Sequence, residues 1–204
     1  GLTATYGFNL ENNTGATVAD VHFLTIGNDA VSVSIARDNG NNLSASGIPH
    51  VSDTASTVVA GAFHNLGINQ SDGHNDDHVR ADIKGAGGTL TLRYVPSDGA
   101  ANSHTSSAFA DNNSAYDVIY RGSLGVQGLN VVVGQHEVEG TGTNQDAQLR
   151  KLSVAYNFGK FAIGAERQTS EDSAAAGSQD ETTSNVASIT FAVNDKLSFG
   201  IARY

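Results

Sequence analysis

Residues 151–167 read KLSVAYNFGKFAIGAER, and this stretch contains a pattern that recurs along the whole chain. Apolar residues from Leu152 to Phe158 alternate with polar or small ones, and the pair Gly159-Lys160 then separates this run from a second one. A period of two places successive side chains on opposite faces of a β-strand. Glycine tolerates the backbone angles of a hairpin turn. The stretch therefore predicts two antiparallel strands, each with one apolar and one polar face.

The same alternation predicts eleven strands in the chain. We expect them at 2–11, 20–26, 30–37, 79–84, 89–95, 115–124, 129–138, 149–158, 161–167, 186–193 and 197–204. The register of the second strand stays open, because two alternating sets of its residues fit an apolar face. These sets are Val21 with Phe23, and His22 with Leu24 and Ile26.

The gaps between the predicted strands alternate between short and long. The short gaps are turns rich in Gly, Asn and Asp, at 27–29, 85–88, 125–128, 159–160 and 194–196. The long gaps are rich in Ser, Asn, Asp, Gly and Thr and predict exposed loops at 12–19, 38–78, 96–114, 139–148 and 168–185. Long and short connections mix in a soluble β-sandwich, whereas an outer-membrane barrel collects its turns at one end and its long loops at the other. The pattern favours an all-β, antiparallel transmembrane β-barrel.

Composition and strand length agree with such a barrel. The 204 residues include 23 Gly, 2 Pro and no Cys, and no apolar run approaches the ~18 residues of a membrane helix. The lack of Cys excludes a disulfide framework and a thiolate zinc site. A net charge of −10 argues against a nucleic-acid partner, because phosphate recognition needs clustered Lys and Arg. A strand of about nine residues tilted by ~40° covers roughly 23 Å, close to the ~25 Å apolar band of these barrels.

Aromatic residues lie mainly near the ends of the predicted strands. Tyr94 precedes a long gap and Tyr116 follows one, whereas Tyr156, Phe158 and Phe161 lie beside a tight turn. Transmembrane barrels carry such girdles at both membrane interfaces. The alternative is that these rings belong to the core of a β-sandwich.

Three stretches combine aromatic-rich strands, tight Gly or Asn/Asp turns and polar loops. They read YDVIYRGSLGVQGLNVVVGQHEVEG at 116–140, KLSVAYNFGKFAIGAERQTSED at 151–172 and ITFAVNDKLSFGIARY at 189–204. In this repeated order of strand, turn, strand and loop, the chain resembles the general diffusion porins of Gram-negative bacteria, of the alphaproteobacterial kind. The resemblance covers nearly the whole sequence, and the repetition of the cadence carries it more than any single motif.

The resemblance implies a sixteen-stranded porin barrel, a homotrimer and a location in the bacterial outer membrane. Bacterial single-chain barrels have even strand numbers, so eleven strands indicate either a miscounted strand or a piece of a longer chain. We favour the second, which makes 1–204 one partial porin domain, opening without a signal peptide. We expect two strands before Gly1 and about three after Tyr204. Loop 38–78 is then the third external loop, which constricts the pore in such porins, although it lacks the Pro-Glu-Phe-Gly-Gly-like motif of enterobacterial members.

Cations and acids are separated along the chain. All eleven Lys and Arg lie in predicted strands, at strand ends or in tight turns, whereas the long gaps carry acids. The cations expected on the polar face, and hence in the lumen, are Arg80, Lys84, Arg93, Arg121 and Lys151. The acids expected opposite them, in loop 38–78, are Asp53, Asp72, Asp76 and Asp77. Together they predict a transverse field at the constriction.

This charge distribution predicts passive diffusion of small hydrophilic solutes and ions across the outer membrane. We expect a mild preference for cations, because acidic loops raise the cation concentration near the mouth of the pore. No enzyme activity is expected, since no Gly-x-Ser-x-Gly motif or comparable catalytic arrangement occurs. A soluble or cell-surface β-sandwich of the adhesin type is the main alternative. A substrate-specific channel and a phage or colicin receptor also stay open.

A second group of cations lies on the apolar face, each at the strand end nearest a long gap. They are Arg37, Arg150, Arg167 and Arg203. At one height on the outside of a barrel, they predict bidentate contacts with lipopolysaccharide phosphates. Snorkelling to the interface without a specific partner is the alternative. Glu137 has the same parity and height and is a candidate to share a divalent ion with the lipid.

Two other motifs are weaker candidates for ligand-binding sites. Residues 72–78 read DGHNDDH and offer oxygen and imidazole ligands, so Ca²⁺ at this acidic loop is an alternative to a plain polar loop. Their order is not that of an EF-hand, and no terminal Glu follows. Gly85–Gly88 resembles a phosphate-binding loop but lacks the following Lys-Ser/Thr and the helix, which favours a turn. We therefore expect no cofactor.

Overall fold

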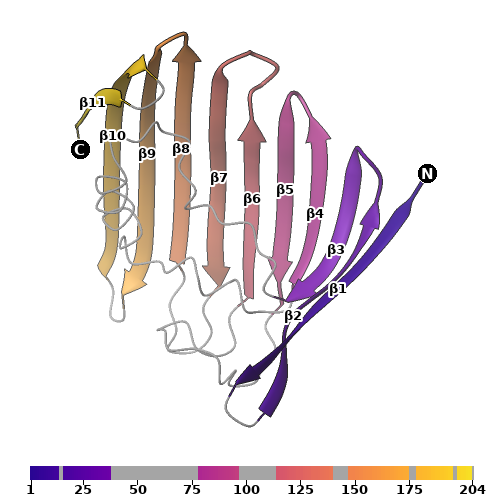
Figure 1. Cartoon of the computed structure of the whole chain (residues 1–204). Helices are drawn as coiled ribbons and strands as arrows, with labels where there is room; N and C mark the ends of the chain where they lie inside the picture. Colours follow the sequence, from indigo (N-terminus) through magenta and orange to yellow (C-terminus); the bar gives the residue numbers. More distant parts are fainter. Residues whose placement is uncertain are drawn as a thin grey trace.

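The chain forms one continuous antiparallel sheet of eleven strands in a computed structural model, which describes residues 1–13, 16–37, 78–96, 114–139, 147–174, 178–194 and 197–203. The strands pair in chain order and stand side by side as a curved wall (Figure 1). They are β1 (Thr3–Asn13), β2 (Ala16–Gly27), β3 (Val31–Arg37), β4 (His78–Gly85), β5 (Gly88–Val95), β6 (Ser114–Gly122), β7 (Leu129–Glu139), β8 (Ala147–Phe158), β9 (Phe161–Ala174), β10 (Ser178–Asn194) and β11 (Leu197–Arg203). Within these residues, no helix has the length and apolar character needed to cross a bilayer.

All eleven predicted strands are confirmed, but two of the predicted loops are wrong. Most of 12–19 and of 168–185 belongs to paired strands, because the β1–β2 and β9–β10 hairpins extend far beyond their apolar parts. In the second hairpin, for example, Thr169 pairs with Thr183. Antiparallel pairing satisfies the backbone polar groups whatever the side chains are, and threonine fits a pleated strand well. Polar composition alone therefore did not mark a loop.

The remaining predicted loops, 38–78, 96–114 and 139–148, lie outside the described residues except at their ends. The role of 38–78 as a pore constriction therefore stays a prediction. The sixteen-strand count implied by the resemblance stays a prediction as well.

The described short connections are tight turns at the end of the sheet drawn uppermost in Figure 1. At 85–88, both central residues have positive φ, 49° for Ala86 and 71° for Gly87, as the commonest two-residue hairpin turn requires. In the β2–β3 turn, Asn28 Oδ1 accepts hydrogen bonds from two backbone N–H groups. The β4–β5 turn is tied to the neighbouring strand β6, since Tyr120 Oη donates to the Ala86 carbonyl at 2.8 Å. Residues 85–88 are thus a hairpin turn, as predicted, and not a phosphate loop.

The two faces of the sheet differ in composition and in exposure. We call the side that carries Ser34, Thr91 and Lys151 the polar face, and the side that carries Ile35 and Leu152 the apolar face. On the apolar face, Ile35 is 61% and Leu152 49% exposed, whereas Thr91 and Lys151 on the polar face are 2% and 3% exposed. A soluble protein buries its large apolar side chains instead. This inverted arrangement is the one that a lipid-facing barrel wall needs.

The structure decides the register of β2. Leu24 pairs with Ile35 and Ile26 pairs with Val33, and all four side chains are exposed large apolar residues. Leu24 and Ile26 therefore lie on the apolar face. Thr25, between them, bonds to Ser34 through their hydroxyl groups at 2.7 Å on the polar face.

Candidate functional site

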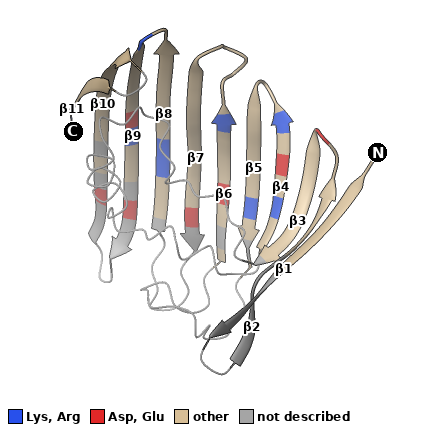
Figure 2. Cartoon of the chain, in the orientation of Figure 1, with Lys and Arg blue, Asp and Glu red and all other residues tan. Residues whose placement is uncertain are grey.

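Charged residues recur along β4 to β9 (Figure 2), and those that share the polar face form a band across these strands. Strand pairing places these side chains in three rows that run across the strands. The first row contains Arg80, Arg93, Asp117 and His136. The second contains Asp82, Thr91, Ile119, Gly134, Lys151 and Gln168. The third contains Lys84, Thr89, Arg121, Val132, Ser153 and Glu166.

The five cations predicted for the polar face all belong to these rows. Successive rows are two residues apart along each strand, or roughly 7 Å. The first row lies nearest the long connections, and the third lies nearest the tight turns. The sequence parity thus placed these cations on the right face. Their role in a pore stays a prediction.

The centre of the first row is a buried charge cluster around Asp117. The side chains of Arg93 and Asp117 are only 4% and 3% exposed. Arg93 Nε donates to Asp117 Oδ2, and His136 Nδ1 is hydrogen-bonded to Asp117 Oδ1. Both carboxylate oxygens therefore have partners, which a buried carboxylate needs to offset its lost hydration.

A second cluster surrounds Asp82, on β4. Arg80 Nη2 and Asp82 Oδ2 are 2.9 Å apart, and Arg80 Nε donates to Asp82 Oδ1 at 3.1 Å. Thr91 Oγ1 on β5 donates to the same oxygen at 2.6 Å. The guanidinium thus binds the carboxylate through two nitrogens, which fixes its orientation as well as adding energy. With side chains about one-fifth exposed, this pair is more accessible than the Asp117 cluster.

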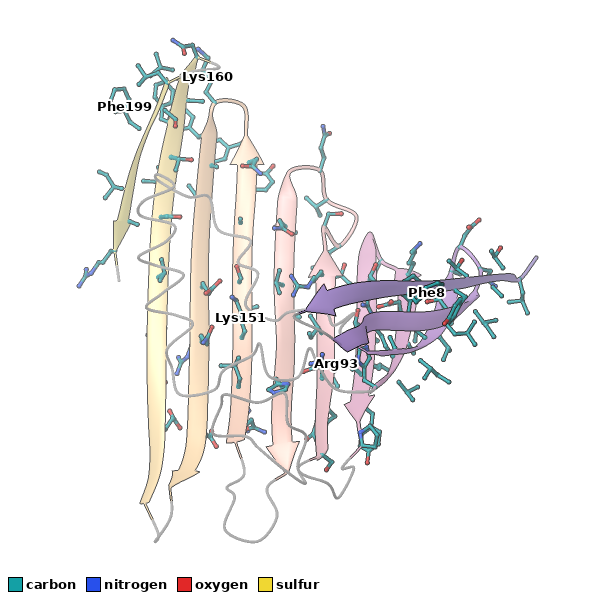
Figure 3. The ribbon with its side chains drawn as sticks, turned by 60° about the horizontal axis from the view of Figure 1, so that its bottom comes forward. Phe8, Arg93, Lys151, Lys160 and Phe199 are labelled. Carbon is teal, nitrogen blue, oxygen red and sulfur yellow. The ribbon has the colours of Figure 1, made fainter. Side chains whose placement is uncertain are left out.

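Lys151 and Glu166 form a third ion pair, between β8 and β9. Their Nζ and Oε2 atoms are 3.3 Å apart, and each side chain is 1% exposed. The polar face is not uniformly polar around them, because Ile119 and Leu149 are also fully buried there. Figure 3 shows Lys151 along the length of β8 and Arg93 toward the end of β5 nearest the long connections, both far from Lys160 at the turn end. The charged groups are thus held in fixed pairs rather than spread over a mobile surface.

Sequence reasoning missed the acids of these three pairs, Asp82, Asp117 and Glu166. It placed the counter-charges in loop 38–78 instead. Asp53, Asp72, Asp76 and Asp77 lie outside the described residues, so their position opposite the cations stays a prediction. The parity of the missed acids was visible in the sequence. Their partners were not, because a cross-strand pair depends on a register that sequence leaves open.

The arginines predicted for the outer rim are on the apolar face where their side chains are described. Arg150, Arg167 and Arg203 are exposed there, and the Arg37 side chain lies outside the described residues. Pairing places Arg167 beside Leu152, and Arg203 beside Ala187, so the three form a diagonal across β8 to β11. From one strand to the next, the position of the arginine shifts by about one residue. In a barrel whose strands tilt by ~40°, residues at the same height in the membrane are offset by about this amount on neighbouring strands.

Glu137 lies at the same end of the apolar face and accepts three hydrogen bonds. Tyr116 Oη donates to Glu137 Oε2, and the side-chain amides of Gln135 and Gln148 donate to the same oxygen at 2.9 Å each. Arg150 Nη1 is 3.6 Å from Glu171 Oε1 nearby. Across the described ranges, no group of three or more His, Asp or Glu side chains is arranged to hold a metal. A divalent ion shared by Glu137 and lipid remains a prediction, as does Ca²⁺ at 72–78.

Comparison with known proteins assigns a family to this arrangement. A family model described as Gram-negative porin matches residues 1–204. A search of the curated proteins gave no match. The family match extends over every strand of the sheet and over both long segments that the structure does not describe.

Proposed function

Because the chain belongs to the Gram-negative porin family, it is a β-barrel channel of the bacterial outer membrane, and we propose that the polar face of β4 to β9 lines its lumen. Small hydrophilic solutes and ions then pass by diffusion, with no chemical step. The inverted burial of the sheet is the observation that carries this assignment. A soluble β-sandwich, the main alternative, needs a partner layer on side chains such as Ile35 and Leu152, which are exposed instead.

The three ion pairs give the lumen wall fixed dipoles. Arg80, Arg93 and Lys151 each have a carboxylate partner, so much of their charge is neutralised within the wall. Water and polar solutes orient in the field of such pairs. Only the Arg80–Asp82 pair is partly exposed, and the side chains of the other two pairs are 1–4% exposed, so we propose that the pairs act on solutes through their field and not as a binding site.

A mild preference for cations is part of the proposal. The chain carries 21 Asp and Glu but only 11 Lys and Arg. Three of the five wall cations are paired with carboxylates, and the acids of the long connections add negative potential at the mouth. Among them, Asp53, Asp72, Asp76 and Asp77 belong to the proposed constriction loop 38–78. The reversal potential in a salt gradient measures this preference, and a value showing strong anion preference contradicts it.

A homotrimer is also part of the proposal, with contacts through the apolar face of β2 to β4. The exposed large side chains described there are aliphatic: Leu24, Ile26, Val31, Val33, Ile35, Val79 and Ile83. Aromatic rings on the apolar face lie on the flanking strands, at Tyr6 and Tyr94 for example. Aromatic girdles mark the parts of a barrel that meet the lipid interface. A wall section without them fits contact with another copy of the chain.

Unheated gel electrophoresis tests this contact surface. Val33→Asp should release monomers from the assembly, because an unpaired carboxylate would be buried between copies. Ile163→Asp on β9 places the same charge on lipid-facing wall, so both variants share the cost of a charge on the apolar face, but the Ile163→Asp protein that folds should still assemble. Equal behaviour of the two variants would contradict the proposed surface.

Charged thiol reagents test the channel itself, because the chain has no cysteine of its own. Thr89→Cys lies on the polar face of β5 and Leu92→Cys on the apolar face of the same strand. In planar bilayers, a positively charged methanethiosulfonate reagent should lower the conductance of the Thr89 variant and leave that of the Leu92 variant unchanged. The opposite pattern, or no conductance in the unmodified protein, would reject the assignment.

A further inference from the structure

A furrow of about 840 Å³ lies on the apolar face, along β7 and between β6 and β8. Its floor includes Val133, which pairs with Tyr120 on one side and Leu152 on the other. Valine has the shortest side chain of the three in this cross-strand row. From Tyr116 to Tyr120 the lining extends over four residue steps, or roughly 13 Å. The furrow is therefore long, narrow and mostly apolar.

The end of the furrow nearest the long connections is polar and cationic. Gln135, Arg150, Arg167 and Thr169 line it there. Arg150 pairs with Thr169, and Arg167 with Leu152, so the two arginines are diagonal neighbours with Cβ atoms ~7–8 Å apart. The Arg150 side chain is 57% exposed. Two long guanidinium side chains at this separation have one phosphate group within reach, and planar bidentate contacts to phosphate are favoured by arginine.

We propose that this furrow binds one molecule of a phosphorylated lipid of the outer leaflet, a lipopolysaccharide. One acyl chain lies on Val133, and a lipid phosphate contacts Arg150 and Arg167. The inference rests on the proposed function, because it needs the apolar face to meet the membrane. It separates these two arginines from Arg203, which lies on β11 away from the furrow.

The apolar part of the furrow selects its acyl chain by shape and not by hydrophobicity. An acyl chain gains little by leaving the bilayer for a protein surface, because the surrounding lipid is equally apolar. Close packing against Val133, Val118 and Leu152 and the phosphate contacts must supply the preference. Both parts of the furrow are therefore needed for the lipid to stay bound.

Two acids lie near the cationic end, and one of them provides a test of the inference. Glu137 is already satisfied by three donors, whereas Glu171 is 3.6 Å from Arg150 in a loose, exposed pair. A phosphate bound at Arg150 displaces Glu171, so Glu171→Gln should strengthen lipid binding. A divalent ion bridging the acids to the phosphate predicts the reverse, with weaker binding in this variant and release by a chelator.

Native mass spectrometry of the detergent-solubilised full chain tests the proposal with lipid A as the probe. We expect one retained lipid A per chain, with retention lowered about tenfold, or by ~1.4 kcal/mol, in Arg150→Gln/Arg167→Gln and in Val133→Trp. Two matched controls, Arg203→Gln and Ile189→Trp, place the same changes on the apolar face outside the furrow and should retain lipid A as the wild type does. Dephosphorylated lipid A should bind more weakly, and inorganic phosphate alone should not displace the intact lipid.

Several results would overturn the proposal. Retention at the wild-type level in Val133→Trp would exclude an acyl chain in the furrow. An equal loss of lipid A retention in Arg203→Gln would show only a general attraction between arginines and anionic lipid. Weaker lipid A binding in Glu171→Gln would exclude direct contact between phosphate and Arg150.

Conductance of the same preparations separates this inference from the channel. The variants change only the apolar face, so each should conduct as the wild type does. Lipid loss with intact conductance supports the furrow. A wild-type protein that fails to conduct contradicts the channel, and the lipid measurements then still decide for or against the furrow.

Discussion

Arg150 and Lys151 are adjacent in the chain and have opposite environments. Arg150 lies on the apolar face with 57% of its side chain exposed, whereas the Lys151 side chain is 1% exposed and paired with Glu166. The pleat of β8 separates them, since successive side chains point to opposite faces. A residue type therefore has no fixed role here. Whether its position in the strand is odd or even decides whether a cation lies on the apolar face or on the polar face of the sheet.

Removing one partner of the buried Lys151–Glu166 pair should be strongly destabilising. Lys151→Met leaves a buried carboxylate without its cation, which typically costs ~3–5 kcal/mol. The midpoint of urea unfolding in lipid vesicles should fall accordingly.

The double variant Lys151→Met/Glu166→Leu is the matched control for that loss. It removes both charges and keeps similar volumes, so most of the lost stability should return. If the double variant is as unstable as the single one, packing rather than charge accounts for the effect.

At the scale of single elements, hairpins organise the sheet and the tight turns fix their geometry. The β4–β5 turn lies against the β6–β7 connection, where Ser123 N donates to the Gly87 carbonyl at 2.9 Å. A Cβ atom added at Gly87 would lie 2.3 Å from the backbone nitrogen of Gly125. The turn thus needs glycine for close approach, and not only for its φ of 71°.

Gly87→Ala should lower stability by ~1–3 kcal/mol, the range for strained backbone sites. Ala86 already has positive φ in the same turn, so the contact with Gly125 accounts for most of the effect. Refolding yield into detergent micelles and the urea midpoint both measure it.

Gly85→Ala provides the control for this turn, because a Cβ there meets no atom within 4 Å. Its stability should match that of the wild type. Equal losses in the two variants would show that glycine at 85–88 acts through chain flexibility and not through contact.

At the scale of the whole molecule, the membrane serves as the solvent for one face of the wall. Ile163, Ile189 and Ile201 pair across β9, β10 and β11 and form an apolar row whose last two members are 45% and 74% exposed. In water such a surface would drive aggregation. In a bilayer the same row is solvated by acyl chains, and the charged rows on the other face are kept away from lipid.

Ile189→Lys should impair insertion, because a lysine on the lipid face is unfavourable, by up to ~2–4 kcal/mol at the midplane. Folding into lipid vesicles, followed by heat-modifiable gel mobility, reports the change. Ser188→Lys carries the same charge on the polar face of β10 and should fold as the wild type does. Similar folding of both variants would contradict the assignment of the two faces.

The alternation of residues was enough to locate the strands and to assign their faces. Period-two alternation, as in the run from Leu152 to Phe158, located all eleven strands and placed all five predicted polar-face cations on the correct side. The inference is robust because side-chain direction in a strand depends only on parity. The likeness to porins, read from the same cadence, agrees with the family that matches the chain.

Which residues face one another across strands became clear from the folded sheet and not from the sequence. The register of β2, the extension of β9 and β10 through 168–185, and the pairing of Arg93 with Asp117 all depend on how neighbouring strands align. The furrow over Val133 likewise forms only where β6 and β8 pair with β7. Alternation repeats every two residues, so sequence patterns fit several alignments equally well. Hydrogen bonding and packing between strands choose among those alignments, and that choice builds the charge pairs.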